Sequence, residues 1–456
     1  MKMKKLLLLG LMMAIGTSLS AGTVKMTTSK AAGETLSFAV NSGLTLTLTW
    51  GDGSTESLVS TGMLQNVTIK NEQLTISCEK DITSLYVAEN GLTTLDISGS
   101  AKTLRTLCCA DNQLKTLSLT NCSNLVILDC QGNQLTSLSN PSKNMQDMNV
   151  ADNQLTATGL SSTAGLLSMV CANNKIKTIT SLANMTNLTA LFCQGNLIET
   201  LPLANLVNLK HLVASDNSIK TLTFKSSSSA LTDIEDLWVS NNELTALDLS
   251  EMKKIVGIVA ANNKLASVKW DYSTAKRNVK YADLSGNSLP FSSLPNLYST
   301  VVSANTVDGS VSPQNNVQMI SESIAVNEKT TTAFSDLIGR SGWNNLVKAE
   351  IKVVDGNGNE LKDGVDYKFE SNINLTFLTA PHENVVLSFT SPSFPDMVMT
   401  SAPFNVTGST DGIETLENEA LDLNNSKIFD LQGRQMDAST LKKGIYIING
   451  KKVIIR

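Results

Sequence analysis

A pattern of about 21 residues recurs through the middle of the chain and constrains its fold more than any other feature of the sequence. Residues 82–290 repeat the pattern L-x-x-L-x-φ-x-x-N-x-L-x-x-L, where φ is Cys, Val, Leu, Ile or Ala. A repeat this short cannot bury a core alone, so successive copies must stack and share one. The copies are marked by ten asparagines: Asn90, Asn112, Asn133, Asn153, Asn174, Asn196, Asn217, Asn242, Asn263 and Asn287.

Each x-L-x-φ-x segment predicts one short strand, and stacking these strands gives a parallel sheet with neighbours about 4.8 Å apart. The leucines and the φ residues then point into the shared core. Each asparagine lies where the chain leaves its strand, and its buried amide must bond to the backbone of that turn. So few residues remain for the outer, convex side that we expect short 3₁₀ turns or extended chain there. The fold class is therefore mainly β, a solenoid.

This array, residues 81–297, resembles bacterial leucine-rich-repeat proteins of the internalin type. The resemblance covers roughly half the chain. It implies a solenoid that binds a partner, often a host-cell protein, without indicating which one. Cysteines occupy the φ position in four repeats, as in the cysteine-ladder subgroup: Cys109, Cys130, Cys171 and Cys193. Five other repeats depart from the ladder: Val150, Ala214, Val239, Ala260 and Leu284.

The seven cysteines of the chain raise the question of disulfides. Adjacent repeats bring the ladder cysteines within bridging distance. The side chains of in-register parallel strands run side by side, however, which gives a poor disulfide dihedral. Spacing of His and Cys typical of a zinc site is absent. We expect buried free thiols and no metal or cofactor, with disulfides as the alternative.

The N-terminus is typical of a signal peptide over residues 1–20. Three lysines among the first five residues precede the apolar run Leu6–Gly16, and Ser18 and Ser20 precede a cleavage point before Ala21. Eleven apolar residues are too few to cross about 30 Å of hydrocarbon. No transmembrane segment is expected elsewhere, so the sequence predicts an exported protein, secreted or at the cell surface.

Residues 34–80 predict an N-terminal β cap, since a solenoid end must be covered. The segments 36–38, 44–50 and 67–69 are strand-like and rich in Thr. The second of them runs into Trp50-Gly51-Asp52-Gly53, which resembles the W-G-D-G start of small β-domains on bacterial surfaces.

Residues 298–408 lose the repeat and predict an immunoglobulin-like β-sandwich. Strand-like segments at 349–354, 367–369, 374–378 and 385–389 are separated by Gly, Asn, Asp and Pro. In the stretch from Asp355 to Asn359, Asp and Asn residues alternate with glycines, as in a calcium-binding loop. The EF-hand glycine position holds Glu360 instead, so a hairpin turn is the better interpretation.

Residues 409–425 form an acidic linker with five acids and no base, and the charge then reverses. Lys427–Arg456 carries seven bases and two acids. Within this C-terminal tail, 426–456, the segments 428–433, 443–447 and 451–455 resemble the sorting domain of type IX secretion substrates. That resemblance implies delivery to the outer surface, removal of the tail and attachment to the outer membrane. The alternative is a small terminal β-hairpin with its turn at Asn449-Gly450.

The candidate binding site is the concave face, which we define as the outward residues of the parallel strands. Five apolar side chains in successive repeats form a stripe at the central outward position. Contiguous exposed apolar surface usually marks an interaction site. The predicted site comprises the stripe Val170, Phe192, Val213, Trp238 and Val259, flanked by His211, Asp236 and Tyr281.

Aromatic anchors with a polar rim favour a protein ligand for this face. A glycan is the alternative, because Trp238, Phe192 and Tyr281 are able to stack on sugar rings beside Asp236. Two further interpretations give the stripe no ligand: the residues serve β-propensity, or the C-terminal sandwich covers them. We expect a monomer.

Enzymatic activity and nucleic-acid binding are not expected. The two histidines, His211 and His382, fall in different predicted domains, and no Ser/His/Asp or Cys/His arrangement is visible. Cys108, predicted to face solvent, lacks an activating base. The mild net charge of −5 does not indicate a basic nucleic-acid face.

Overall fold

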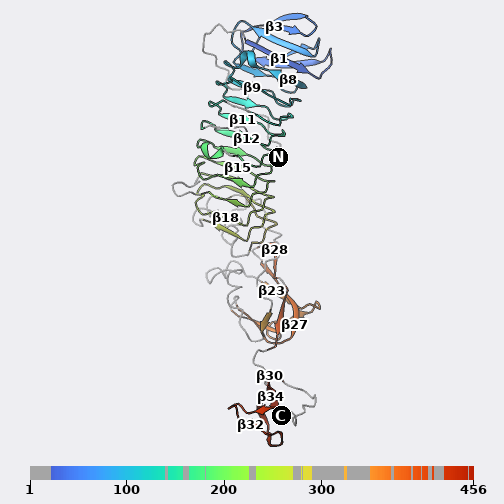
Figure 1. Ribbon diagram of the computed structural model, residues 1–456, viewed down its shortest axis with the longest axis vertical. Helices are drawn as coiled ribbons and strands as arrows, with labels where there is room; N and C mark the ends of the chain where they lie inside the picture. Colours follow the sequence, from blue (N-terminus) through green and yellow to red (C-terminus); the bar gives the residue numbers. More distant parts are fainter. Residues whose placement is uncertain are drawn as a thin grey trace. The chain divides into compact units, whose positions relative to one another are not determined.

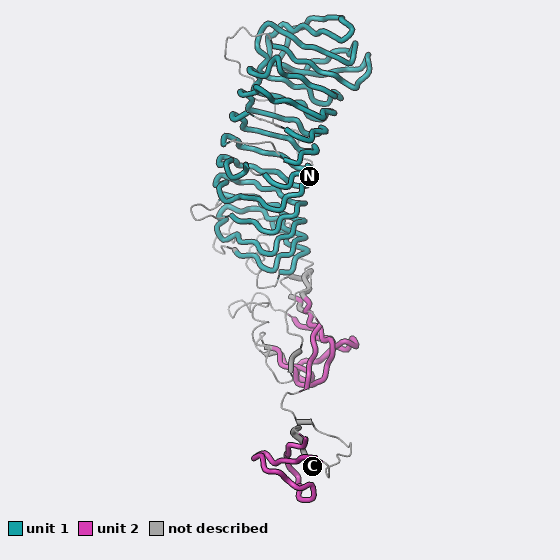
Figure 2. The backbone as a smooth tube through the Cα atoms, viewed as in Figure 1, with its two compact units in different colours: residues 1–289, 296–313 teal, residues 290–295, 314–456 magenta. Residues whose placement is uncertain are grey.

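The computed structural model divides into two compact units, residues 1–289 with 296–313 and residues 290–295 with 314–456 (Figure 2). The predicted signal peptide of residues 1–20 lies outside the described residues, as does most of the predicted linker 409–425. The described residues are 22–138, 142–157, 164–179, 181–224, 233–270, 279, 281–289, 323–325, 350–370, 374–391, 394–401, 403–408, 413–414, 426–449 and 451–455.

The first unit begins with a five-stranded antiparallel sheet in the order β4-β3-β6-β1-β8. Alternating apolar residues bury one face of it, including Leu46, Leu48 and Trp50. The first strand, β1, precedes the start of the predicted cap at residue 34, and β8 already belongs to the first repeat. The bounds are β1 Gly22–Thr28, β3 Thr45–Trp50, β4 Thr55–Val59, β6 Gln73–Cys78 and β8 Leu92–Asp96.

Strand β2 (Thr35–Val40) joins this N-terminal region to the repeats. Its first residues pair with β5 (Gln65–Thr68), and its last two, Ala39 and Val40, pair with the first strand of the repeats. The sheet of the solenoid therefore continues into the cap, where β5 is its last strand.

Ten parallel strands, one per repeat, stack into the predicted sheet, which together with β2 and β5 has twelve strands (Figure 1). Each is only three residues long, and its central residue is buried. The predicted parallel solenoid is thus confirmed. The strands are β7 Ser84–Tyr86, β9 Thr106–Cys108, β10 Ile127–Asp129, β11 Asp147–Asn149, β12 Ser168–Val170, β13 Ala190–Phe192, β15 His211–Val213, β17 Asp236–Trp238, β19 Gly257–Val259 and β21 Tyr281–Asp283.

The ten asparagines bond to the backbone, as predicted, and they join each repeat to the one before. In Asn174, Nδ2 donates to the carbonyls of Cys171 and Ala172 in its own repeat and to that of Val150 in the preceding one, at 3.0–3.2 Å. Its Oδ1 accepts from the N–H of Leu155, at 2.9 Å. Every polar atom of this buried amide is therefore paired.

The convex side consists of short 3₁₀ turns and extended chain, as expected for repeats of this length. A 3₁₀ turn, η2, occupies Leu182–Asn184. Two pairs of short strands add small parallel sheets: β14 (Thr200–Leu201) with β16 (Thr221–Leu222), and β18 (Ala246–Leu249) with β20 (Ser267–Trp270).

The second unit contains mainly antiparallel sheets. Its larger sheet has the order β22-β29-β27-β23-β24, with β28 pairing to β27, and β25 pairs separately with β26. The Asp355–Asn359 stretch is a hairpin turn in which Asp355 Oδ1 accepts from the N–H groups of Asn357 and Asn359. The bounds are β22 Ser323–Ala325, β23 Glu350–Val354, β24 Glu360–Leu361, β25 Tyr367–Glu370, β26 Asn374–Phe377, β27 His382–Ser391, β28 Phe394–Thr400 and β29 Phe404–Thr407.

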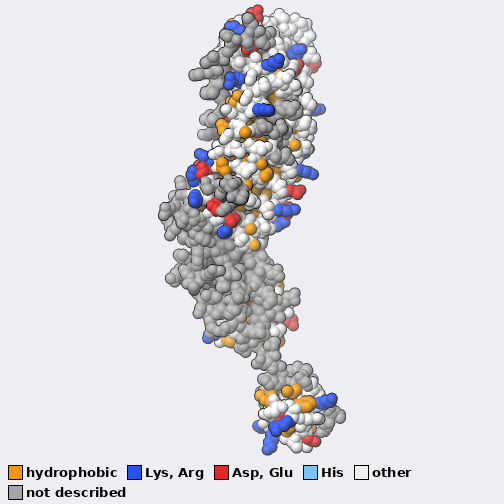
Figure 3. Space-filling view, turned by 60° about the vertical axis from the view of Figure 1, so that its left-hand side comes forward, with side chains coloured by type: hydrophobic (Ala, Val, Ile, Leu, Met, Phe, Trp, Pro, Cys, Tyr) orange, Lys and Arg blue, Asp and Glu red, His pale blue; other side chains and the backbone are white. Residues whose placement is uncertain are grey.

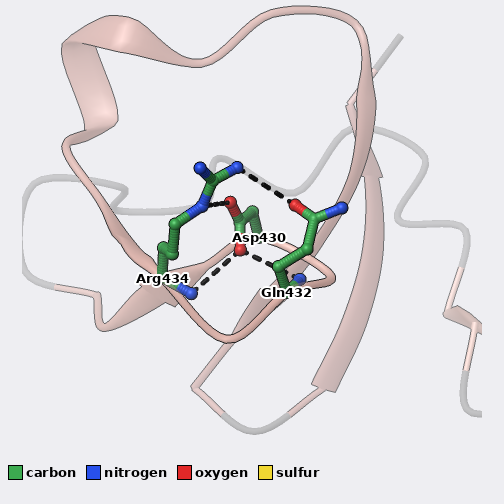
Figure 4. Close-up of polar contacts among 3 residues, drawn as sticks. All are labelled: Asp430, Gln432 and Arg434. Carbon is green, nitrogen blue, oxygen red and sulfur yellow. Dashed lines mark hydrogen bonds and ion pairs between the residues drawn. The ribbon is translucent and has the colours of Figure 1, made fainter.

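A small C-terminal sheet in the order β30-β34-β33-β31-β32 ends the chain. Its first turn is held by Asp430, which accepts from the backbone N–H groups of Gln432 and Arg434 and from Arg434 Nε at 2.7 Å (Figure 4). The backbone of Arg434 and its guanidinium lower the pKa of Asp430, although partial burial opposes them. The bounds are β30 Ile413–Glu414, β31 Ile428–Phe429, β32 Gln435–Met436, β33 Gly444–Ile448 and β34 Lys451–Ile455.

Candidate functional site

Parallel pairing places the predicted apolar stripe in one register. Val170 lies beside Phe192, Phe192 beside Val213, Val213 beside Trp238, and Trp238 beside Val259. Trp238 is 39% exposed, and the other four side chains are half-buried. At about 4.8 Å per strand, this column extends for about 19 Å. The column is therefore a continuous apolar strip rather than a set of isolated side chains.

A second column of outward residues lies two positions earlier on the same strands, in the order His211, Asp236, Gly257, Tyr281. His211 Nδ1 lies 2.8 Å from Asp236 Oδ2, and both side chains are 40% exposed. The structure therefore brings the three predicted flanking residues into one column beside the stripe. The imidazole fixes the orientation of the Asp236 carboxylate.

Gly257 interrupts this second column, and it is buried although its position faces outward. A Cβ added to Gly257 would meet a single described atom within 4 Å, Asp236 Oδ1 at 2.9 Å. The second oxygen of the Asp236 carboxylate therefore lies close to the place where a side chain of residue 257 would stand. Sequence analysis missed this contact, although a glycine at an outward strand position signals close approach of another group.

The concave face is acidic, which sequence analysis also missed. No Lys or Arg occupies the two outward columns in any of the ten repeats. The same holds for the residue two positions after the stripe column and for the residue directly before each key asparagine. Burial raises the pKa of Asp147 and, together with the charge of Asp111, that of Asp129. The acids at these positions are Glu89, Asp111, Asp129, Asp147, Asp152, Asp216, Asp236 and Asp283.

The residue before each key asparagine adopts positive φ, a conformation that only Gly and short polar residues adopt readily. In three places the amides of these residues form a side-chain ladder. Asn173 donates to Asp152, Asn241 to Asp216, and Asn262 to Asn241, at 2.7–2.9 Å. The ten residues are Glu89, Asp111, Gly132, Asp152, Asn173, Gly195, Asp216, Asn241, Asn262 and Gly286.

Cys108 does not face solvent, contrary to the prediction. It is only 4% exposed and packs with Ala88 and Ala110, with the Tyr86 ring against the cluster. Small neighbours on this part of the face let Tyr86 pack against the cluster that contains the thiol. Burial, with a contribution from Asp129, raises the pKa of Cys108 to about 12. The side chain is therefore held as a thiol, which is a poor nucleophile.

The ladder cysteines are fully buried in the solenoid core. All seven cysteines are free and buried, and burial raises the pKa of each ladder thiol. Within the described part of the chain, no group of three or more His, Cys, Asp or Glu residues is placed to hold a metal ion. The same residues include no helix with the length and apolar character needed to cross a bilayer.

Comparison with solved structures finds similar bacterial leucine-rich-repeat proteins. The functional domain of InlJ from Listeria monocytogenes, which includes a cysteine ladder, is 20% identical, with 71% of this chain and 86% of that chain covered and a TM-score of 0.38. An internalin (inlF) from the same organism is 22% identical, covering 52% and 74%, with a TM-score of 0.39. A leucine-rich-repeat protein of Leptospira interrogans is 18% identical, covering 50% and 72%, with a TM-score of 0.37.

No family model matches the sequence, and no curated protein does. The solenoid assignment rests on the strand pairing and asparagine hydrogen bonds of this chain itself.

Proposed function

We propose that this chain is an exported binding protein without enzymatic activity, which holds a protein partner on the concave face of its repeats. The observation that carries the proposal is the exposed Trp238 in register with Phe192, Val213 and Val259. These outward side chains contribute little to the inward-facing leucine core. Large aromatic side chains at the centre of an apolar strip, with polar groups beside them, are typical of the residues that dominate protein interfaces.

A glycan is the second candidate ligand. Trp238 and Tyr281 are able to stack on sugar rings, and Asp236 and Asp283 supply acceptors for hydroxyl groups. The half-buried apolar stripe weighs against it, because sugars bind through hydrogen bonds that Val170, Val213 and Val259 cannot offer.

Binding to arrays of purified cell-surface proteins and of glycans tests the proposal, using the chain without its predicted leader. Each hit is measured again with Trp238→Ala and Phe192→Ala. We expect Trp238→Ala to weaken binding by about 2 kcal/mol and Phe192→Ala by somewhat less, since the smaller ring buries less area. The free energy of unfolding of each variant should lie within about 0.5 kcal/mol of the parent's.

Val207→Ala is the matched control, because Val207 is 41% exposed and lies outside the parallel sheet. It should leave affinity unchanged. Normal binding of a verified partner by both aromatic variants would show that the concave face is not the site. A fall in stability matching the loss of affinity would instead assign the rings a structural role.

For localisation, we propose export with loss of the leader and, if the type IX resemblance holds, loss of the tail from about Lys427. Mass spectrometry of the mature surface protein tests both steps. An intact C-terminus at Arg456 would contradict tail removal, while leaving the binding proposal untouched.

A further inference from the structure

We propose that two copies of this chain pair antiparallel through the outer edge of β5, which joins their two solenoid sheets. The proposal is independent of the ligand of the concave face, and it departs from the monomer expected from the sequence. Three observations carry it: outward backbone groups on β5, an edge without charge, and a hydrogen-bond pattern that a second β5 matches.

The backbone of Asn66 in β5 faces away from the sheet. Asn66 pairs with Ser37 of β2, but the N–H and C=O of Ser37 are bonded to the Asn90 side chain on the other side of β2. The N–H and C=O of Asn66 therefore point outward, and by alternation those of Thr68 do too. Because β5 is the last strand of its sheet, no described strand lies beyond it to pair with these four groups.

This edge lacks the features by which natural sheets usually avoid pairing, such as Lys, Pro or a bulge. The run from Ser57 to Ile69 contains no charged residue and no proline, whereas charged side chains are spaced along the first unit in Figure 3. Three apolar side chains in this run, Val59, Met63 and Leu64, are 55–62% exposed. An unpaired edge of this kind is a template for another strand.

The loop before β5, which carries these exposed side chains, is held by hydrogen bonds. The Ser60 hydroxyl donates to the Asn41 carbonyl at 2.7 Å. The side-chain amide of Gln65 accepts from the Thr61 N–H at 3.3 Å and donates to the Val59 carbonyl at 3.1 Å. Because the loop is already ordered, association at this edge costs little further conformational freedom.

A second β5 matches the outward groups in one register. When two copies run antiparallel about a two-fold axis at Val67, Asn66 of each copy lies opposite Thr68 of the other. Each of these pairs exchanges two backbone hydrogen bonds, so every outward group of both strands is paired. The same register places Leu64 opposite Lys70 of the other copy, whose aliphatic stem covers apolar surface while its ammonium stays in water.

The two-fold axis also sets the size of the assembly. It uses the β5 edge of both copies at once, so association stops at a dimer rather than continuing into a filament. The contact is short compared with a stable protein interface, so we expect a weak dimer that forms as the concentration rises.

Sedimentation equilibrium of the chain without its predicted leader, at concentrations up to about 0.5 mM, measures this dimer. Thr68→Pro removes two of the four intermolecular hydrogen bonds and should raise the dimer Kd about tenfold or more. An edge strand tolerates proline where the N–H faces solvent, so the bonds to β2 and the thermal unfolding midpoint should be kept. Thr68→Ala, the matched control, retains the N–H and should dimerise as the parent does.

A change of charge at residue 64 tests the register without altering the backbone. Leu64→Lys places a cation opposite Lys70 of the other copy at both ends of the contact, and should raise the dimer Kd about threefold or more. Leu64→Glu faces the same lysine with the opposite charge and should dimerise at least as tightly as the parent. Both substitutions are at an exposed side chain, so neither should impair folding.

Ser57→Pro is the control for the edge itself. Ser57 lies on β4, the edge strand of the five-stranded sheet, and its neighbours Ser54 and Ser60 donate or accept hydrogen bonds with β3 or the residues next to it. Alternation therefore turns the Ser57 backbone outward, as on β5. This variant should leave the dimer unchanged.

Four results would overturn the proposal. They are a monomer at every concentration, species larger than a dimer, equal effects of Leu64→Lys and Leu64→Glu, and a dimer that folded Thr68→Pro keeps. Loss of the dimer in Ser57→Pro alone would assign the contact to β4. Should Thr68→Pro fail to fold, the opposite effects expected of the two Leu64 variants still decide the question.

Discussion

The imidazole of His211 lies 2.8 Å from one oxygen of the Asp236 carboxylate, and the other oxygen of that carboxylate lies 2.9 Å from the place where a Cβ of Gly257 would stand. Two neighbouring strands, β15 and β17, supply the pair, so the repeat register fixes their distance. A polar group oriented on a rigid sheet binds without first losing side-chain freedom, which favours affinity.

The asparagine ladder predicts a large loss of stability from one truncation. Asn174→Ala leaves the buried Leu155 N–H without its partner, whereas the carbonyls of Val150, Cys171 and Ala172 each keep a second donor. A buried group left unpaired costs about 1–3 kcal/mol, so we expect the free energy of unfolding to fall by about 1–3 kcal/mol. Chemical denaturation measures it. Lys175→Ala, at the exposed adjacent residue, should change stability by less than about 0.5 kcal/mol; equal effects of the two would contradict the ladder.

The strand-exit glycines predict a second effect on stability. Gly195 has φ of 66°, and a Cβ there would collide with Asn173 Oδ1. Gly195→Ala should therefore destabilise the solenoid by about 1–2 kcal/mol. Gly257→Ala, where the new Cβ meets only a movable side-chain oxygen, should cost well under 1 kcal/mol. Thermal unfolding of the two variants compares them, and the reverse order would refute the assignment of these positions.

Asp129 predicts a pH-dependent gain in stability. Burial raises its pKa, so the folded state holds the proton more tightly than the unfolded chain does. Ionisation of Asp129 therefore destabilises the folded state. This destabilisation is absent below the unfolded pKa of 3.8 and grows as pH rises from there through the raised pKa of the folded state. Asp129→Asn, which keeps an acceptor for the Gln131 N–H, should be more stable than the parent at neutral pH and equal to it in strong acid.

Asp96 supplies a control of opposite sign. The Ser98 hydroxyl and N–H lower the pKa of Asp96. Its charged form therefore stabilises the folded state above the unfolded pKa, and this stabilisation is lost as the pH falls through the lowered pKa. Asp96→Asn should be neutral in acid and destabilising at pH 7. Denaturation midpoints measured across pH decide between the two signs.

The buried cysteines predict that the native chain does not react with a thiol reagent. All seven are buried, and burial raises the pKa of Cys108 and Cys193 to about 12 and that of Cys122 to about 11. At pH 8 almost no thiolate is present, so the native chain should not react with Ellman's reagent, whereas the denatured chain should release seven equivalents. Thr221→Cys, at an exposed position, serves as the reactive control. Fewer than seven equivalents after denaturation without reductant would reveal disulfides.

The sequence was sufficient to predict the solenoid because its period is a chain-level constraint. The leucine position of Leu107 and the asparagine position of Asn112 recur in every repeat at a spacing that stacked strands satisfy. Alternation along each strand then fixes which side chains face outward. The stripe from Val170 to Val259 follows from that alternation alone.

What the sequence did not predict depends on contacts between neighbouring repeats. Cys108 is outward by alternation, yet Tyr86 on the strand before it packs against the cluster that buries the thiol. The close approach of Asp236 Oδ1 to Gly257 likewise depends on how the Asp236 side chain turns. Strand β1 pairs with β6 and β8, far away in sequence, and no local pattern indicates that pairing.

The backward reach of each asparagine gives the first repeat a problem that the cap solves. Asn90 has no earlier repeat, and its amide bonds instead to a single residue of β2: Nδ2 donates to the Ser37 carbonyl at 2.6 Å, and the Ser37 N–H donates to Oδ1 at 2.8 Å. Ser37 therefore supplies to Asn90 the backbone partners that a neighbouring repeat supplies to the later asparagines. Anyone grafting these repeats onto a different N-terminal module would have to supply one extended residue there with both backbone groups free, whatever the rest of that module looked like.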